Sequence, residues 1–256
     1  FEKIPGGPIG YWIFPSFFNV FMKCITLGDI SNLRSGISTG NNERYYRHWT
    51  EVKFEKVRIN ANPLLIKNEK LIDTKKWYSV IRGGEYIKWF GNQEYIINLE
   101  NNGYDIRTSG LNHRLRTPSY YFQEGITWSR ISTGKSAFRV KTENVNFGEN
   151  SPCLFTNVSV NILLGILNSP VCSYVLQIIS PTLSFQAADI SKIPVPVFKH
   201  SELVENEVRN CITISEESWM SHETTWNFDK NSFLNFKNRD KNSLKLLYTD
   251  YCIYWR

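Results

Sequence analysis

The chain has 256 residues, of which 41% are hydrophobic and 21% are charged. This composition is typical of a folded globular protein and excludes an intrinsically disordered one. The five cysteines are scattered without a Cys-x-x-Cys pair, and no histidine stands at zinc-ligand spacing from them, which argues against a disulfide framework or a zinc finger.

The charge is unevenly distributed along the chain. Residues 1–145 hold 21 Lys and Arg against 13 Asp and Glu, a net charge of +8, and residues 146–256 hold 9 against 11, a net charge of −2. The basic half predicts an anionic partner. A solvated basic surface without any partner explains the charge equally well.

Short β-like runs separated by turn residues follow the apolar N-terminal segment. The strand candidates are residues 52–59, 94–99, 119–123, 126–131 and 136–141. Turn sequences such as Asn101-Asn102-Gly103 lie between them. We therefore expect residues 1–158 to form a β-rich body.

From about residue 158 the hydrophobic period changes from two to nearly four. Leu163 and Leu167 share one helical face, and Ser169-Pro170 can cap and start a second helix. Because polar residues and a proline interrupt this apolar stretch, we expect a buried helical hairpin rather than a membrane span, with an extended strap completing a unit over residues 159–200.

Residues 201–256 predict a helical C-terminal part that is truncated at its end. Ser201 and Ser215 are both placed to start helices, and a further helix begins near the end of the sequence. The whole chain is thus predicted to be one α+β body, a β-rich domain followed by a helical part.

The sequence carries no signature of a nucleotide-binding or hydrolytic enzyme. Gly134-Lys135-Ser136 matches the end of a P-loop, but Ser129 stands where the first glycine is needed. There is also no Gly-x-Ser-x-Gly elbow. We therefore predict no catalytic residue and no metal ligand in this chain.

The basic half contains the groups that bind DNA. Arginine and lysine neutralise phosphates, Ser and Thr bind phosphate oxygens, and asparagine pairs with adenine. Many of these groups surround an Ile-Ser-Thr-Gly quartet that occurs twice, at 37–40 and 131–134. The candidate DNA-binding residues are Ser38, Thr39, Asn41, Asn42, Arg44, Arg47, Arg82, Lys88, Asn92, Arg107, Arg130, Ser132, Thr133, Lys135 and Arg139.

The two quartets are not an internal repeat, because the sequences that flank them do not align. Both are small polar turns next to cations. We expect them to lie close together on one DNA-facing surface.

Four blocks of the sequence, residues 77–107, 120–140, 163–196 and 214–228, resemble in order the C-terminal region of the BREX phage-defence adenine-specific DNA methyltransferases, the PglX family. Residues 36–49 resemble the segment that opens this region in the family. The third block is also similar to the specificity subunits of multi-subunit restriction systems.

This resemblance implies a target-recognition region with a fold similar to DNA methylase specificity domains. It would recognise duplex DNA for an N6-adenine methyltransferase of a phage-defence or restriction–modification system. An upstream domain of the same chain would bind S-adenosylmethionine and carry an Asn-Pro-Pro-Tyr-type motif. Here Asn62-Pro63 is followed by two leucines, so no cofactor is expected in this fragment. The implied partners are double-stranded DNA, the upstream methyltransferase domain and other defence-system subunits, in the cytoplasm and without a membrane.

Two other interpretations remain. The chain can be a protein–protein adaptor region of a defence complex, in which the aromatic residues Tyr45, Tyr46, Trp49, Trp89 and Phe90 contact partner subunits. A carbohydrate-binding module is suggested by the aromatic content alone and gives the basic half no role.

Overall fold

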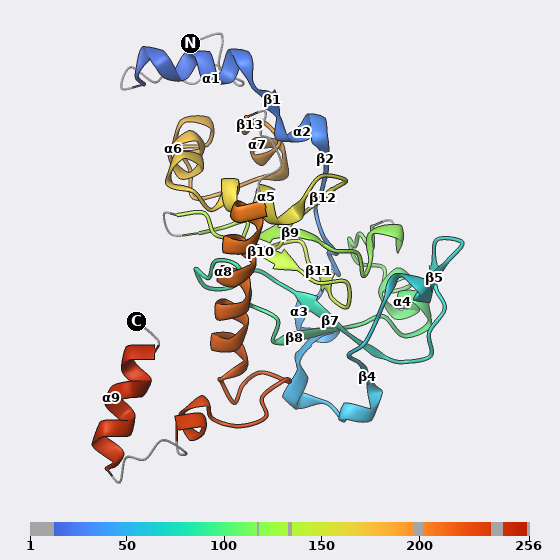
Figure 1. Cartoon of the computed structure of the whole chain (residues 1–256). Helices are drawn as coiled ribbons and strands as arrows, with labels where there is room; N and C mark the ends of the chain where they lie inside the picture. Colours follow the sequence, from blue (N-terminus) through green and yellow to red (C-terminus); the bar gives the residue numbers. More distant parts are fainter. Residues whose placement is uncertain (1–12, 117, 133–134, 197–201, 237–242, 255–256) are drawn as a thin grey trace.

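Two β-sheets, each with its own hydrophobic core, form the centre of the molecule, and helices lie around them (Figure 1). The structure is a computed structural model that describes residues 13–116, 118–132, 135–196, 202–236 and 243–254. Its mixture of sheets and helices confirms the predicted α+β class.

The first sheet has four antiparallel strands in the order β10-β9-β12-β2. Its strands are β10 (Phe138–Lys141), β9 (Gly125–Trp128), β12 (Cys153–Thr156) and β2 (Ser31–Arg34). Alternate residues such as Ile126 and Phe138 pack on the helices α5 (Val160–Leu167) and α6 (Pro170–Ile179). The indole N–H of Trp128 is buried in this core and donates to the carbonyl oxygen of Phe185 at 2.9 Å.

The second sheet has five strands, with the order β11-β7-β8-β3 and with β4 also paired to β7. Its strands are β11 (Asn146–Phe147), β7 (Trp77–Ile81), β8 (Tyr95–Asn98), β3 (Tyr46–His48) and β4 (Val57–Arg58). Tyr78, Val80 and Ile97 lie on one face and pack with Ile106 and Phe122. This face therefore carries the second core.

The remaining strands form two short antiparallel ribbons of two strands each. β1 (Ile25–Thr26) pairs with β13 (Pro194–Val195), and β5 (Ile66–Lys67) pairs with β6 (Lys70–Leu71). The first ribbon ties the predicted proline-rich strap to the N-terminal segment.

Further α-helices occur throughout the described part of the chain. They are α1 (Pro15–Lys23), α2 (Leu27–Ile30), α3 (Asn42–Tyr45), α4 (Glu100–Arg107), α7 (Ala187–Ile190), α8 (Glu202–Met220) and α9 (Leu244–Tyr254). The first part of the long helix α8 packs against α5. Further along α8, the Ser215 hydroxyl donates to the carbonyl oxygens of Lys88 and Phe90, both at 3.0 Å. In Figure 1 this helix runs alongside the two sheets.

The predicted helical hairpin is confirmed. The Ser169 hydroxyl caps α6 by accepting from the Cys172 N–H at 3.1 Å, and the axes of α5 and α6 differ by 68°. Most of the apolar residues in this pair are buried. Within the described ranges, no single helix has both the length and the apolar character that a membrane crossing requires, and only this bent pair meets the test in combination.

Several predicted elements were wrong. Residues 119–123 form no strand, because Pro118–Tyr120 is a 3-10 turn and Phe122 has a φ of 55°. In the run 52–59 only Val57–Arg58 is a strand, after a 3-10 turn over Phe54–Lys56.

The C-terminal helices also differ from the prediction. The two helices expected from Ser201 and from Ser215 are one continuous helix, α8, in which Ser215 is an internal residue. Ser201, the predicted cap, lies outside the described residues. The predicted final helix is present as α9.

Candidate nucleic-acid interface

The first quartet is held rigidly by backbone hydrogen bonds on both sides. The Ile37 N–H donates to Phe147, and the Ile37 carbonyl accepts from Glu149, both at 2.9 Å. Ser38 pairs with Arg114 through two bonds of 3.0 and 2.7 Å. Gly40, with a φ of 75°, closes the turn where a Cβ atom would lie 2.8 Å from the Asn112 carbonyl oxygen. The turn is therefore a fixed platform.

Helix α3 starts directly after this platform and presents polar side chains to solvent. The Asn41 side-chain oxygen caps the helix by accepting from the Arg44 N–H at 3.0 Å, and the Asn42 oxygen accepts from the Thr39 hydroxyl at 3.0 Å. Both asparagines therefore have their oxygens engaged and their amide NH₂ groups directed to no partner within the described ranges. Arg44 is exposed and lies over the Tyr45 ring, 5.3 Å from its centre.

Arg82 lies over two aromatic rings. Its guanidinium carbon lies 4.5 Å from the centre of the Tyr46 ring and 4.8 Å from that of Tyr95. The Tyr46 hydroxyl donates to Ile37 at 3.2 Å, which links this pair of rings to the first quartet. Burial raises the pKa of Tyr46, so the hydroxyl stays protonated. In the described part of the chain, the Arg82 guanidinium has no hydrogen bond or ion pair.

Arg82 lines a shallow recess together with Asn42, and three further charged side chains form its rim. Arg47 is engaged there, because its guanidinium donates to the Glu43 and Tyr46 carbonyl oxygens and lies 3.9 Å from the Glu51 carboxylate. The Glu43 and Glu51 carboxylates offset part of the positive charge. Arg82 is thus the cation of the recess that is available to a ligand.

Two basic residues that were not among the predicted candidates, Arg114 and Arg116, also lie beside the first quartet. Arg114 is exposed, and its side chain has no partner among the residues that the structure describes. Arg116 is exposed as well and donates to the Gly36 carbonyl oxygen at 3.3 Å. The only sequence signal is the basic run His113-Arg114-Leu115-Arg116. We use the name quartet surface for Asn41, Asn42, Arg44, Arg82 and Arg114.

The second quartet starts near the first and then diverges from it. The Arg130 N–H donates to Asn150 at 2.9 Å, one residue after Glu149, which donates to Ile37. Beyond this point Ser132 bonds to Leu183 instead, at 3.0 Å, whereas Ser38 bonds to Arg114. The prediction that both turns share one DNA-facing surface stays a prediction.

The other candidates of the second quartet have mixed positions. Arg130 is half-buried and paired with Glu149 at 3.5 Å, and the Ser132 hydroxyl donates to the Lys135 carbonyl oxygen at 2.7 Å. Lys135 is exposed, and Thr133 lies outside the described residues.

Four candidates are engaged inside the protein. Arg139 is fully buried and donates to the Ile87 carbonyl and the Ser129 hydroxyl at 3.0 and 3.1 Å, and burial lowers its pKa to about 10. Asn92 and Thr39 are also buried, and the Lys88 ammonium donates to the Asn168 carbonyl at 2.9 Å. In this structure these side chains are engaged in contacts within the protein.

Arg107 has a separate location on α4. Its side chain is exposed, and its Nε–H donates to the Asn102 carbonyl oxygen at 3.0 Å. Asn101, Asn102 and Gly103 have φ values of 49°, 59° and 71°, so the helix is regular only after them.

Two observations on the described residues concern a cofactor motif and a metal site. Asn62 of the Asn-Pro pair uses its side-chain oxygen to accept from the Leu64 N–H at 3.0 Å, and Leu64 is exposed. Across the described ranges, no three His, Cys, Asp or Glu residues are grouped so as to hold a metal ion.

Comparisons with known proteins show which proteins this sequence is similar to. No protein-family model matches the chain. It is 35% identical, over 257 aligned residues, to the adenine-specific methyltransferase BrxX of Escherichia coli O9:H4 (strain HS), an alignment that covers 98% of this chain and 20% of BrxX. It is 33% identical, over 243 residues, to the adenine-specific methyltransferase PglX of Lacticaseibacillus casei (strain Zhang), covering 91% of this chain and 20% of PglX.

A solved structure gives a weaker likeness. The HsdS subunit from Thermoanaerobacter tengcongensis matches 79% of this chain and 40% of its own, with a TM-score of 0.35 and 12% identity. This is a partial likeness of arrangement only. The two sequence relatives are much closer, and the chain spans about one fifth of the length of each. The chain therefore corresponds, over nearly its whole length, to one segment of the adenine-specific methyltransferases BrxX and PglX.

Proposed function

We propose that this chain recognises duplex DNA for an N6-adenine methyltransferase. The similarity to BrxX and PglX supports the connection to adenine methylation. The observation that carries the proposal is a set of three arginines, Arg44, Arg82 and Arg114, which surround a rigid turn and form no ion pair with any described residue. Duplex DNA has a dense row of phosphates that such cations neutralise.

The quartet surface combines two kinds of DNA contact. Arg44 and Arg114 are exposed on a platform fixed by main-chain bonds, which suits phosphate binding that sets the position of the duplex. The amide groups of Asn41 and Asn42 can donate to base edges or phosphates. Arg82 lies over two aromatic rings, which restrict its side chain and reduce the entropy that it would lose on binding.

Methyl transfer itself would take place outside this chain. S-adenosylmethionine would supply the methyl group in the complete enzyme, held by a methyltransferase domain that precedes this segment. The expected partners are that domain, duplex DNA and other subunits of the defence system, in the cytoplasm.

Equilibrium binding of a labelled DNA duplex, measured by fluorescence anisotropy, tests the proposal. We expect an Arg44→Ala/Arg114→Ala variant to bind roughly ten- to hundredfold more weakly than the wild type, because two charged hydrogen-bond donors are removed. The matched control is Arg209→Ala/Lys245→Ala, which removes the same charge from exposed positions on α8 and α9. Equal weakening in both variants, or no binding by the wild type, would count against the proposal.

A further inference from the structure

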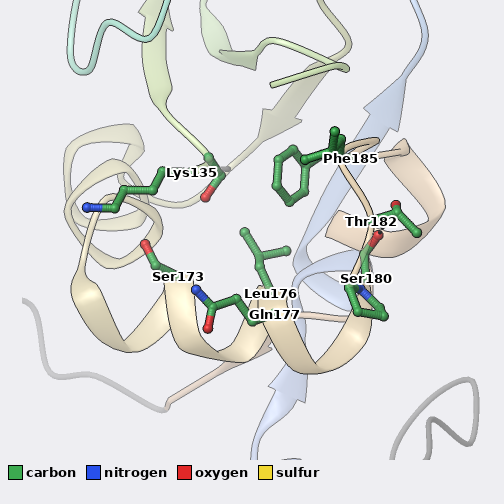
Figure 2. Close-up of a pocket in the computed structure, with 10 residues that line it drawn as sticks. Lys135, Ser173, Leu176, Gln177, Ser180, Thr182 and Phe185 are labelled. Atoms are coloured by element: carbon green, nitrogen blue, oxygen red, sulfur yellow. Dashed lines mark hydrogen bonds between the residues drawn. The ribbon is translucent and has the colours of Figure 1, made fainter. Parts of the chain in front are cut away.

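A small pocket lies between the residues that follow the second quartet and helix α6 (Figure 2). Its volume is about 140 Å³. Leu176 and Phe185 supply an apolar wall, and Lys135, Ser136, Ser173 and Gln177 supply polar groups. In Figure 2 the Ser173 hydroxyl lies between the Lys135 and Gln177 side chains. No carboxylate is among the residues that line the pocket.

The pocket contains hydrogen-bonding groups that the protein does not use. Ser136 is 6% exposed, and its hydroxyl has no hydrogen-bond partner among the described residues. Buried hydroxyls are normally paired, so an unpaired one in the lining of a pocket is a position where a ligand or a water molecule can bind. The Lys135 ammonium and the Gln177 amide are exposed at the same pocket, and neither has a partner in the described ranges.

The size of the pocket limits what it can hold. A cavity of about 150 Å³ with apolar walls accommodates one benzene molecule. At about 140 Å³ this pocket has room for one six-membered ring but not for the two fused rings of a purine. The remainder of any larger ligand must therefore stay outside, near Lys135.

Exposed apolar side chains lie on the pocket wall and on the segment paired with it. Leu183, which lines the pocket, is 58% exposed, and Ile131, whose segment pairs with residues 183–185, is 62% exposed. Their backbones are paired, because Ser132 donates to Leu183 at 3.0 Å and Phe185 donates to Arg130 at 2.7 Å. Apolar side chains held in this way are those that proteins insert between bases when they distort a duplex.

We propose that this pocket binds a single unpaired thymine nucleotide of a DNA strand. The ring would lie against Leu176 and Phe185, with the methyl group on the apolar wall. The Ser136 hydroxyl and the Gln177 amide match the carbonyl and N–H groups on the pairing edge of thymine, and Lys135 matches the adjacent phosphate.

This inference rests on the proposed function, since an adenine methyltransferase that extrudes its target base leaves the opposite thymine unpaired. The pocket would then stabilise the opened duplex from the side of the partner strand.

Anisotropy with three duplexes of otherwise identical sequence tests the pocket. One is fully paired, one has a thymine opposite an abasic site, and one has an adenine opposite an abasic site. We expect the unpaired thymine to increase the affinity about five- to tenfold over both other duplexes, the effect of about one net hydrogen bond. Thymidine monophosphate alone is the fourth probe.

Two variants separate the pocket from the rest of the surface. Ser136→Ala removes the unpaired hydroxyl and should keep or raise the melting temperature, whereas Gln177→Trp blocks the pocket from an exposed helix position. Both should lose the preference for unpaired thymine and bind the fully paired duplex like the wild type.

Equal affinity for the two abasic duplexes, or a thymine preference that survives in both variants, would overturn the pocket assignment. In that case binding of the paired duplex would leave the proposed function intact, whereas loss of binding to every duplex would overturn both. If thymidine monophosphate bound as tightly as the duplex with unpaired thymine, the ligand would be a free nucleotide and the strand assignment would be wrong.

Discussion

Replacing Lys141 with methionine is expected to stabilise the fold at neutral pH and to leave DNA binding unchanged. Lys141 lies on β10 and is fully buried. Its ammonium donates to the carbonyl oxygens of Gln123 and, at 3.4 Å, of Thr142, and it lies 5.9 Å from the ring centres of Phe147 and Phe155. Methionine keeps the length and flexibility of the side chain and removes the charge.

The magnitude follows from the effect of burial on the ammonium. Burial lowers the pKa of Lys141 from 10.5 to about 8, although the neighbouring Cys153 thiol opposes this change. The gap corresponds to roughly 3 kcal/mol of free energy that the charged form costs the folded state at neutral pH. Loss of the hydrogen bonds to two carbonyl groups offsets about 1–2 kcal/mol of this. The variant should therefore be about 1–2 kcal/mol more stable at pH 7.

The advantage of the variant should depend on pH in a defined window. The unfolded chain holds the Lys141 proton up to about pH 10.5 and the folded chain only to about pH 8. Between these values the unfolded state binds more protons than the folded state. The wild type therefore becomes more stable as pH rises, and the destabilisation caused by the charged Lys141 diminishes. The free-energy difference between variant and wild type should be constant below pH 8 and about 1.4 kcal/mol smaller at pH 9 than at pH 7.

Urea unfolding of both proteins at pH 7 and pH 9 measures this difference. Burial raises the pKa of the neighbouring Cys153 thiol to about 12, well above this range. The other titratable groups are present in both proteins, so their contributions largely cancel. A difference that stays the same at the two pH values would show that the Lys141 ammonium is not destabilised by burial. Reduced DNA affinity in the variant would show that the interior charge contributes to the DNA-binding field.

Two further predictions concern the core and the choice of DNA sequence. Asn168→Ala should lower the free energy of unfolding by about 1–3 kcal/mol in urea. The buried Asn168 amide pairs with both the N–H and the carbonyl of Phe138, at 3.1 and 2.9 Å, and its loss leaves the Phe138 N–H unpaired, whereas the carbonyl keeps its bond from the Trp89 N–H. An effect under about 1 kcal/mol would contradict this. Exchanging the aligned segment of Escherichia coli BrxX for this chain should change the adenine motif found by methylome sequencing, and retention of the BrxX motif would contradict recognition by this segment.

The sequence predicted the elements whose hydrophobic period is clear. Helices α5 and α6 follow from Leu163, Leu167 and the Ser169-Pro170 cap, and β8 and β10 follow from their β-branched and aromatic residues. The run 119–123 has the same β-like composition but turns at Phe122, which has a φ of 55°. Propensity carries no information about such a tertiary constraint.

The candidate site was predictable only where its residues are neighbours in sequence. Asn41, Asn42 and Arg44 follow the first quartet directly, whereas Arg114 reaches it through strand-like pairing with Ser38. Arg139 was predicted from its charge to bind DNA, whereas the structure buries it together with every other residue of β10, so no alternation marks an outer face. Burial of a cation by carbonyl acceptors leaves no trace in the local sequence pattern.

The salt dependence of duplex binding tests the central claim most directly. In a plot of log Kd against log salt concentration, the wild type should have a slope of about 2.7, because Arg44, Arg82 and Arg114 make three phosphate contacts. In Arg44→Ala/Arg114→Ala this slope should fall by about 1.8. The Arg209→Ala/Lys245→Ala control should keep the wild-type slope. A wild-type slope near zero, or the same slope in all three proteins, would contradict DNA binding by the quartet surface.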